Sequence, residues 1–373
     1  MTSPESQDPY AAAGVDYAVM DPSKLRAQRA AEGTAVSLAA RGLSELGESR
    51  GESAYVVEFR DHYVSTVTEA LGTKNLVADA VRALTGRTHY DQIARDTVAT
   101  ILNDLATVGG FPVSLTAYWG VGESAWFEDS ARMADLTDGW AAACRAGHVA
   151  WGGGETQVLV GVIEPGAIVL GGNAVGCIQP KHKLLIGSRV EAGDAILLAP
   201  ASGIHANGLT LARRIAESLP QGYATLVPGD RAGRGYGEVL LDPAPLYGPL
   251  VEALQDADLE LHYAVHVTGH GWRKLMRSPK SVSYVIERLP EVNPIFRLLC
   301  EASNLSEADG YGTFNMGAGY ALYLPEASAA RAIELARTLG VELLHAGHVE
   351  PGPRRVILRP VNVSFDGSAL QIR

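Results

Sequence analysis

The residues most able to do chemistry lie along the stretch from Tyr90 to Val108, whose apolar periodicity predicts an amphipathic helix. At about 100° per residue, its apolar side chains gather on one side. A polar stripe on the opposite side is formed by Asp96, Thr100, Asn103 and Asp104. Such a stripe is commonly a solvated surface, but this one contains no lysine or glutamate, the usual solvating residues. Carboxylate oxygens are ligands that Mg²⁺ prefers, so the stripe is a candidate metal-binding face.

Three glycine-rich turns are candidates for binding an anion, because glycine lets backbone N–H groups approach a ligand closely. Two of them precede predicted helices, whose N-termini favour phosphate. The turns are Gly152 to Thr156 (GGGET), Ser202 to Gly208 (SGIHANG) and Thr268 to Gly271 (TGHG). In the first, Glu155 would be a metal ligand or a hydrogen-bond acceptor. In the second, His205 would be a general base or a phosphate contact, and the alternative is a histidine that packs or points to water.

The elements that must position these residues alternate between strands and helices, which predicts an α/β fold with helices stacked on mixed sheets. Residues 54–68 read as a β-hairpin, and residues 219–237, rich in Pro and Gly, read as a surface excursion. A proline and several charged or histidine residues interrupt the apolar pattern at 179–184, where we place a boundary between two α/β domains. The other expected strands are 112–119, 148–151, 195–199, 282–287 and 314–324, and the other expected helices are 136–146, 208–219, 245–254, 272–276 and 328–339.

Composition excludes several classes of protein. The chain has 373 residues, 47% of them apolar, which is enough for the cores of two domains. Its net charge of −11, without a basic run, argues against a protein that coats nucleic acid. Three widely spaced cysteines indicate a reducing compartment and not a disulfide framework. The polar N-terminus lacks the apolar core of a signal peptide and no apolar run is long enough for a membrane span, so we expect a cytoplasmic protein.

Short glycine-centred motifs run through the chain in a fixed order. Each is weak alone, but their order and spacing together resemble the aminoimidazole ribonucleotide synthetase family, also called phosphoribosylformylglycinamidine cyclo-ligase, over about residues 10–350. In order, the motifs are Ala13-Gly14-Val15-Asp16, Leu71-Gly72-Thr73-Lys74, Asn103-Asp104-Leu105, Gly153-Gly154-Glu155-Thr156, Ser202-Gly203-Ile204-His205-Ala206-Asn207-Gly208, Thr268-Gly269-His270-Gly271 and Thr313-Phe314-Asn315-Met316-Gly317.

The resemblance implies a fold and a reaction. Residues 1–51 would be a tail and helical segment, residues 52–180 an N-terminal α/β domain that carries the ATP, metal and dimer contacts, and residues 181–373 a C-terminal α/β domain. The protein would be a homodimeric ligase that uses ATP and Mg²⁺. In this family, ATP phosphorylates the formyl oxygen of formylglycinamidine ribonucleotide. The neighbouring nitrogen then closes the imidazole ring and expels phosphate.

The resemblance also assigns roles to individual residues. The catalytic residues would be His205, Lys74 and Asp96, with Lys74 neutralising phosphate as a point charge. The metal ligands would be Glu69, Asp96, Asp104 and Glu155. The nucleotide contacts would be Gly72, Thr73, Lys74, Asn103, Gly153, Gly154, Thr156, Ser202, Asn207 and Gly269.

The chain departs from the family pattern at several places. Glu69 and Ala70 replace the Asp and the first Gly of the family's Asp-Gly-x-Gly-Thr-Lys motif, and His270 replaces a glycine. Residues 42–51 contain fewer glycines than the family's mobile loop, and no phenylalanine. Two alternatives therefore stay open. One is a paralogue on the same fold that uses ATP to activate another substrate, and the other is a non-catalytic nucleotide-binding protein.

Overall fold

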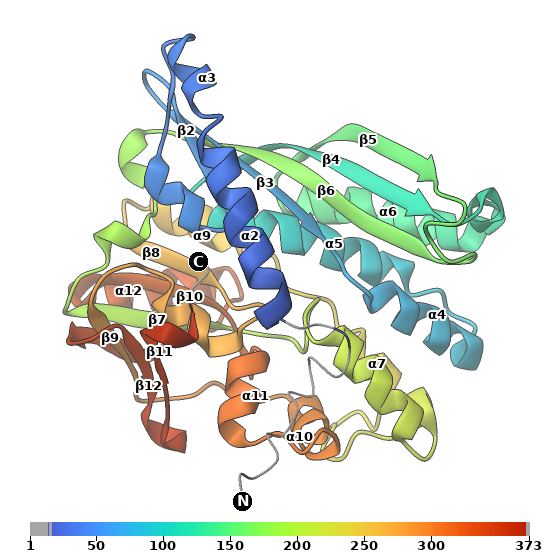
Figure 1. Ribbon diagram of the computed structural model, residues 1–373. Coiled ribbons are helices and arrows are strands. Elements are labelled where there is room, and N and C mark those ends of the chain that lie inside the picture. Colours follow the sequence, from blue (N-terminus) through green and yellow to red (C-terminus); the bar gives the residue numbers. More distant parts are fainter. Residues whose placement is uncertain (1–13, 15–16, 371–373) are drawn as a thin grey trace, which may run out of the picture.

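The computed structural model describes Gly14 and residues 17–370, which form two α/β halves, one above the other in Figure 1. The expected motif Ala13–Asp16 lies outside the described residues except for Gly14, and the polar tail at residues 1–9 lies outside them entirely. The described residues confirm the expected α/β fold with mixed sheets. Within this part of the chain, no helix combines the length and the apolar character needed to cross a membrane.

The N-terminal half is a six-stranded sheet with helices on one face (Figure 1). The expected hairpin is confirmed as two antiparallel strands, and one pair of strands in the sheet is parallel. In spatial order the strands are β1 (Ser44–Glu45), β2 (Tyr55–Glu58), β3 (Tyr63–Ala70), β6 (Ile168–Ile178), β4 (Phe111–Val121) and β5 (Ala150–Val158). The covering helices are α4 (Lys74–Thr85), α5 (Tyr90–Ala106) and α6 (Ser130–Ala146). Many side chains on the opposite face of the sheet are exposed.

The C-terminal half is a seven-stranded sheet with helices around it. In spatial order its strands are β13 (Val363–Asp366), β12 (Arg355–Leu358), β9 (Val282–Ile286), β11 (Leu344–Pro351), β7 (Asp194–Pro200), β10 (Ala318–Pro325) and β8 (Tyr263–His266). Its helices are α7 (Leu209–Ser218), α8 (Tyr236–Leu240), α9 (Gly248–Asp256), α10 (Pro294–Ala302), α11 (Glu307–Thr313) and α12 (Glu326–Thr338). The last strand of the first sheet ends at Ile178 and the first strand of the second begins at Asp194. The boundary expected at 179–184 falls in this connection.

Several elements differ from their expected form. The expected helix at 272–276 is a 3₁₀ helix, η6 (Gly271–Met276). The expected strand at 314–324 begins only at Ala318, because Met316 and Gly317 adopt positive φ and form a turn. The expected surface excursion at 219–237 is partly internal, since Tyr236 is fully buried. These differences arise where a turn or a tertiary contact overrides the local apolar pattern.

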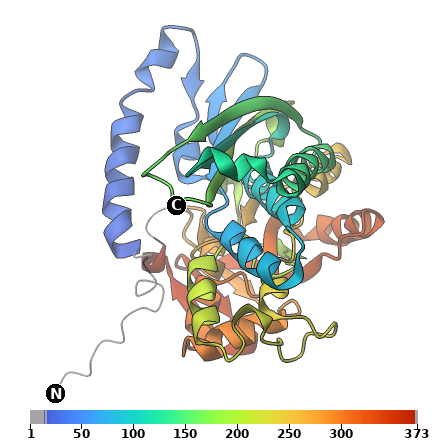
Figure 2. The same ribbon diagram turned by 90° about the vertical axis from the view of Figure 1, so that its right-hand side faces the viewer.

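A helix at the N-terminus, α2 (Tyr17–Glu32), runs along the outside of the molecule, as the two views of Figures 1 and 2 agree. It is tied to the body by hydrogen bonds to the segment before β2. Gln28 donates to the carbonyl oxygen of Arg50 at 2.5 Å, and the Arg50 guanidinium donates to that of Ala31 at 3.3 Å. Most side chains of α2 are exposed, so the helix adds little to the core.

The two halves are joined by the polar stripe of α5. Thirteen of the 17 residues of this helix are buried. Asp96 accepts a hydrogen bond from the backbone N–H of Ala244 at 2.6 Å. Asn103 accepts one from the N–H of Tyr247 at 2.7 Å and donates to the carbonyl of residue 245 at 2.9 Å. Asp104 lies 2.7 Å from Nδ1 of His266. We call these contacts between α5 and residues 244–266 the interdomain seam.

The interdomain seam corrects the interpretation of the stripe. The polar stripe of α5 is not a solvated face, and it is not open to a ligand along its whole length, because the C-terminal half covers it. Asp96 is completely buried and forms an ion pair with Lys74, whose Nζ lies 2.5 Å from Oδ2. Lys74 also donates to the carbonyl oxygen of Asp242 at 3.0 Å. The two side chains therefore satisfy each other inside the protein.

Replacing Asp96 by asparagine tests the seam. Asp96→Asn keeps the size of the side chain but leaves the Lys74 ammonium buried without a counter-charge. Removing one partner of a buried pair costs about 3–5 kcal/mol. We expect a loss of that order in the free energy of unfolding, measured by urea denaturation. The matched control is Asp91→Asn on the same helix, whose partner Arg87 is exposed. Equal stability of the two variants would contradict a structural role for Asp96.

Candidate functional site

A cavity of 260 Å³ lies where the two halves meet. The N-terminal half contributes residues from the end of β3 and from α5. The C-terminal half contributes the turn before α7, the turn after β8, and the last turn of η6 with the residue that follows it. The lining residues are Lys24, Glu69, Ala70, Thr100, Asp104, Ala206, Asn207, Thr268, Gly269, His270, Lys274, Arg277 and Leu370. Polar and charged groups from six separate segments, α2 included, thus converge on one concave space, and convergent polar groups of this kind are typical of small-molecule sites.

The turn that presents Asn207 depends on a glycine. Gly208 has φ +85°, and a Cβ at this position would lie 2.7 Å from the ring of Phe314. A residue with a side chain would meet both the strained φ and the ring. The motif Ser202 to Gly208 is therefore shaped by packing at its last residue, and this packing places the preceding Asn207 on the cavity wall.

Two carboxylates form one wall of the cavity. Burial, together with the negative charge of Asp104, raises the pKa of Glu69 to about 7. Burial also opposes ionisation of Asp104, but the hydrogen bond with His266 and the nearby charge of Lys274 hold the pKa of Asp104 below its ordinary value. Adjacent acids with divergent pKa values are a recurring feature of active sites. Near neutral pH, Asp104 is ionised and Glu69 is close to its midpoint.

Cationic side chains form the facing wall. Lys274 donates a hydrogen bond to the hydroxyl of Thr268. Burial and the neighbouring Arg277 lower the pKa of Lys274 to about 8, so that it is still mostly charged at pH 7. Arg277 is held in place by the carbonyl of Gly51 at 2.9 Å and the hydroxyl of residue 53 at 2.6 Å. Burial and the charge of Lys274 lower the pKa of His270 to about 4, so its imidazole is neutral.

The structure brings together four of the residues that the sequence singled out. Glu69, Asp104, Asn207 and Gly269 all line the cavity. Thr268 of the TGHG motif lines it as well, although no role was predicted for that residue. Sequence reasoning missed Lys24, Lys274 and Arg277, which also line the cavity. Lys274 lies in η6 and Arg277 directly follows it, but nothing in their spacing distinguished them from solvated side chains.

The other predicted contacts on the C-terminal side lie outside the cavity. Ser202 donates its hydroxyl to the carbonyl of Pro243 at 2.7 Å. His205 is buried, its Nε2 accepts a hydrogen bond from the N–H of Ser202 at 3.3 Å, and its ring contacts Tyr247. Burial lowers the pKa of His205 well below its ordinary value. The imidazole is thus a neutral packing group in this structure and does not line the cavity, which matches the packed alternative and not the predicted general base or phosphate contact.

The remaining predicted residues of the N-terminal half are spread over three places. Asn103 belongs to the interdomain seam, and Lys74 and Asp96 are paired beside it. Gly72 and Thr73 form the turn into α4 without lining the cavity. The glycine-rich segment Gly153, Gly154, Glu155 and Thr156 is part of β5, an exposed edge strand. Gly154 and Glu155 line a separate groove of 840 Å³ on the open face of the sheet, which shares only Glu69 and Ala70 with the cavity.

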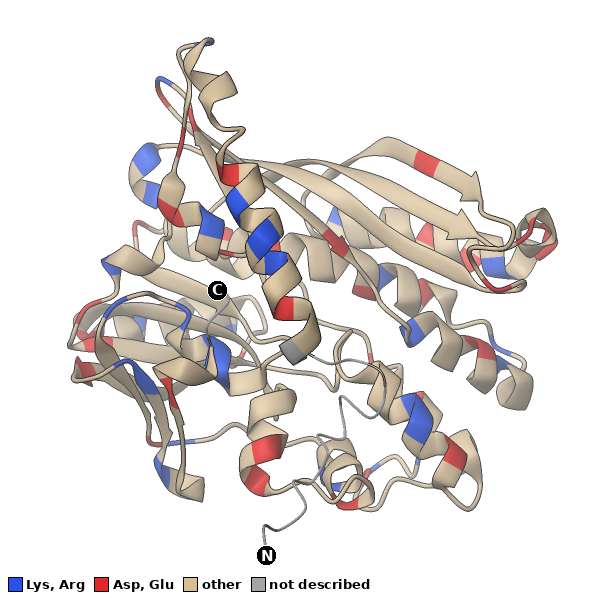
Figure 3. Ribbon diagram, in the orientation of Figure 1, with Lys and Arg blue, Asp and Glu red and all other residues tan. Residues whose placement is uncertain are grey.

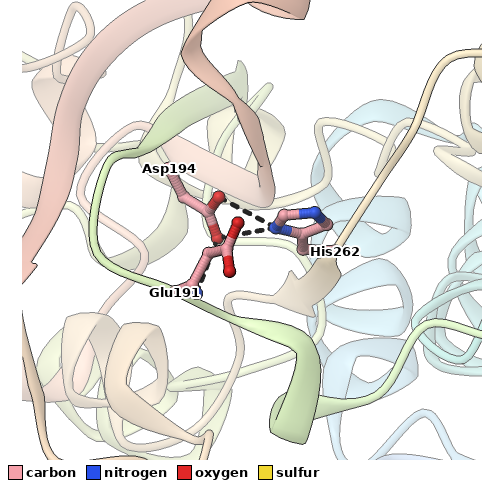
Figure 4. A group of neighbouring side chains, drawn as sticks. All are labelled: Glu191, Asp194 and His262. Atoms are coloured by element: carbon pink, nitrogen blue, oxygen red, sulfur yellow. Dashed lines mark hydrogen bonds and ion pairs between the residues drawn. The ribbon is translucent and has the colours of Figure 1, made fainter.

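The donor set of the cavity fits a magnesium ion. Glu69 and Asp104 offer carboxylate oxygens, and Mg²⁺ is commonly held by one or two carboxylates together with substrate phosphates. A different group of potential ligands, Glu191, Asp194 and His262, lies in the C-terminal half (Figure 4). There Asp194 accepts hydrogen bonds from the N–H of Glu191 at 2.9 Å and from His262 at 2.8 Å, which explains the group as a stabilised turn.

The raised pKa of Glu69 predicts a pH-dependent stability. The folded state favours protonated Glu69, so the free energy of unfolding should fall as the pH rises from about 4.5 to about 7. Glu69→Gln removes this penalty. We expect the variant to be more stable than the parent protein at pH 8, by about 1–3 kcal/mol, but not at pH 4. Urea denaturation at pH 4 and at pH 8 measures this difference in the free energy of unfolding. Glu164→Gln, an exposed residue, is the control, and a pH-independent difference would contradict the assignment.

The sequence of the chain matches two family models. The model described as AIR synthase related protein, N-terminal domain, matches residues 51–178, and the corresponding C-terminal domain matches residues 191–359. Two curated relatives are named phosphoribosylformylglycinamidine cyclo-ligase. That of Carboxydothermus hydrogenoformans is 34% identical over 81% of this chain and 85% of its own length. That of Thermococcus kodakarensis is 34% identical over 87% of this chain and 91% of its own.

Solved structures share the fold at lower identity. HypE in the HypE–HypF complex has a TM-score of 0.58 at 17% identity and covers 82% of this chain and 89% of its own. Thiamine-monophosphate kinase from Stenotrophomonas maltophilia has a TM-score of 0.55 at 20% identity, covering 84% and 90%. Because both domain models match in order across most of the chain, and the relatives align over nearly their whole length, this protein belongs to the AIR synthase related family.

Proposed function

We propose that this protein is an ATP-dependent cyclo-ligase that converts formylglycinamidine ribonucleotide to aminoimidazole ribonucleotide and releases ADP and phosphate, a step of purine synthesis. The relatives with this name span more than four-fifths of the chain. The cavity between the two halves links this proposal to particular residues, because acidic groups of one half face basic groups of the other there. A reaction between two phosphate-bearing molecules requires such a site.

In this proposal the residues of the cavity have different roles. Glu69 and Asp104 would hold Mg²⁺, which would supply positive charge to the phosphates of ATP. His266 keeps Asp104 ionised and oriented. Asn207 and the backbone at Gly269 contact the bound molecules from the C-terminal half. Most of the rate acceleration then comes from positioning and charge neutralisation, as is usual for phosphoryl transfer.

A homodimer is also part of the proposal. The open face of the N-terminal sheet and its edge carry exposed apolar side chains, among them Val113, Trp151, Val158 and Val169. The edge strand β5 is exposed along its whole length. Exposed edges and apolar patches of this kind are normally covered by another chain. A second copy would cover this face and place Gly153, Gly154, Glu155 and Thr156 in an interface.

A cytoplasmic location completes the proposal. Cys144, Cys177 and Cys300 are all free thiols in the described structure. Burial raises the pKa of the Cys144 thiol to about 11, which keeps it protonated and unreactive. Unpaired cysteines of this kind suit a reducing compartment, where ATP is also abundant.

The reaction itself is tested by ADP release with and without formylglycinamidine ribonucleotide, in the presence of Mg²⁺. We expect release to depend on both. Asp104→Asn should lower kcat more than about tenfold, since even partners of metal ligands contribute that much, and should raise the Mg²⁺ concentration needed for half-maximal rate. Glu326→Gln, an exposed residue far from the cavity, should have no effect. ADP release that ignores the ribonucleotide would exclude the cyclo-ligase.

The dimer is tested by light scattering at micromolar concentration. We expect the mass of two chains for the parent protein and of one chain for Val169→Asp, because an unpaired carboxylate in an apolar interface costs more than the contact stabilises. Leu339→Asp places the same charge at an exposed position of the C-terminal half and should leave the dimer intact. A parent protein that scatters as a single chain would contradict the proposed assembly.

A further inference from the structure

The cation expected to neutralise phosphate is not on the cavity wall. Lys74 is completely buried in its ion pair with Asp96 and hydrogen-bonded to the carbonyl of Asp242. Releasing it would leave the buried Asp96 carboxylate without its counter-charge, at high cost. If the cavity receives phosphate groups, the positive charge must come from other residues.

Three other cations line the cavity. Lys274 and Arg277 come from η6 and the residue after it, and Lys24 comes from α2. Lys274 is anchored by Thr268, and Arg277 by the segment before β2. They face Glu69 and Asp104, of which Asp104 already interacts with His266. Three cations of the lining therefore face two carboxylates, and the neutral His270 adds no charge.

The position of Lys24 differs from that of the other two. It is exposed on α2, the helix that runs along the outside and carries further basic residues, shown as blue segments in Figure 3. Lys24 also lies 3.4 Å from Asp21 on the same helix. The site therefore combines a cationic pair in the body of the protein with a lysine on a helix that has few buried contacts.

We propose that Lys274, Arg277 and Lys24 form a subsite for a phosphate group, and that Lys274 neutralises the charge in place of Lys74. A phosphate dianion supplies negative charge beside Lys274 and Arg277 and accepts hydrogen bonds from an ammonium and a guanidinium. The subsite rests on the proposed function for the identity of its ligand, because either the ribose 5-phosphate of the substrate or the phosphates of ATP present this chemistry.

The test measures binding and requires no turnover. Ribose 5-phosphate and ATP are titrated separately into the full-length protein by calorimetry, with EDTA present and at low salt. Lys274→Met should weaken binding of one or both about 10- to 100-fold, the scale of a lost charge-assisted hydrogen bond. If only the binding of ribose 5-phosphate is weakened, the subsite binds the phosphate of the substrate. If only the binding of ATP is weakened, the subsite binds a phosphate of the nucleotide. Unchanged affinity for both would overturn the subsite.

Two further variants control the experiment. Lys24→Met lies on an exposed helix, where folding is not at risk. It should weaken binding of the same ligand about two- to fivefold. If Lys274→Met does not fold, Lys24→Met alone decides the question. Lys183→Met removes a lysine paired with Asp256 elsewhere on the protein and should change nothing. If Lys183→Met weakens binding as much as Lys274→Met, the effect is general electrostatics and the subsite is refuted. Because binding is measured without turnover, loss of the subsite is separable from failure of the ribonucleotide-dependent ADP release.

Discussion

The buried ion pair between Lys74 and Asp96 is the interaction on which the arrangement of the two halves depends. Two opposite charges with no solvent exposure must remain together, because separating either from its partner inside the protein is costly. Lys74 begins α4, Asp96 lies in α5, and both also hydrogen-bond to the backbone of residues 242–244. The pair therefore fixes two helices of the N-terminal half and one segment of the C-terminal half at a single point.

The rest of the interdomain seam extends this fixed point toward the cavity. Asn103, two turns further along α5, uses both ends of its amide on the backbone around residue 246. Asp104 follows and meets His266 at the end of β8. Asp104 also lines the cavity, so this residue belongs both to the interdomain seam and to the candidate site. A displacement of one half relative to the other would therefore move a carboxylate and the facing basic residues apart.

The cavity obtains its electrostatic character from the same junction. Each half alone would present groups of mainly one sign: Glu69 and Asp104 from the N-terminal half, Lys274 and Arg277 from the C-terminal half. Burial, together with the like charge beside each group, shifts their pKa values toward neutrality, to about 7 for Glu69 next to Asp104 and about 8 for Lys274 next to Arg277. The opposite charges across the cavity act against both shifts. Perturbed groups of this kind cluster at functional sites. The groove on the open sheet face is more apolar in its setting and suits a protein surface better.

The sequence by itself determined the family, the α/β class and the elements with strong periodicity, such as the hairpin at 54–68 and the helix of Asp96, since these follow from local apolar spacing. It also identified Glu69, Asp104, Asn207 and Gly269, whose motifs keep their order along the chain.

Only the tertiary structure decided which polar groups face a ligand. Asp96 and Asp104 lie on the same stripe, yet one is sealed against Lys74 and the other opens to the cavity. In the same way, Lys274 lines the cavity, whereas Lys74 is buried against Asp96. Local spacing specifies the side of a helix, but burial and pairing depend on other elements: Asp96 pairs with Lys74 at the start of α4 and is covered by the segment at Ala244, and Asp104 meets His266.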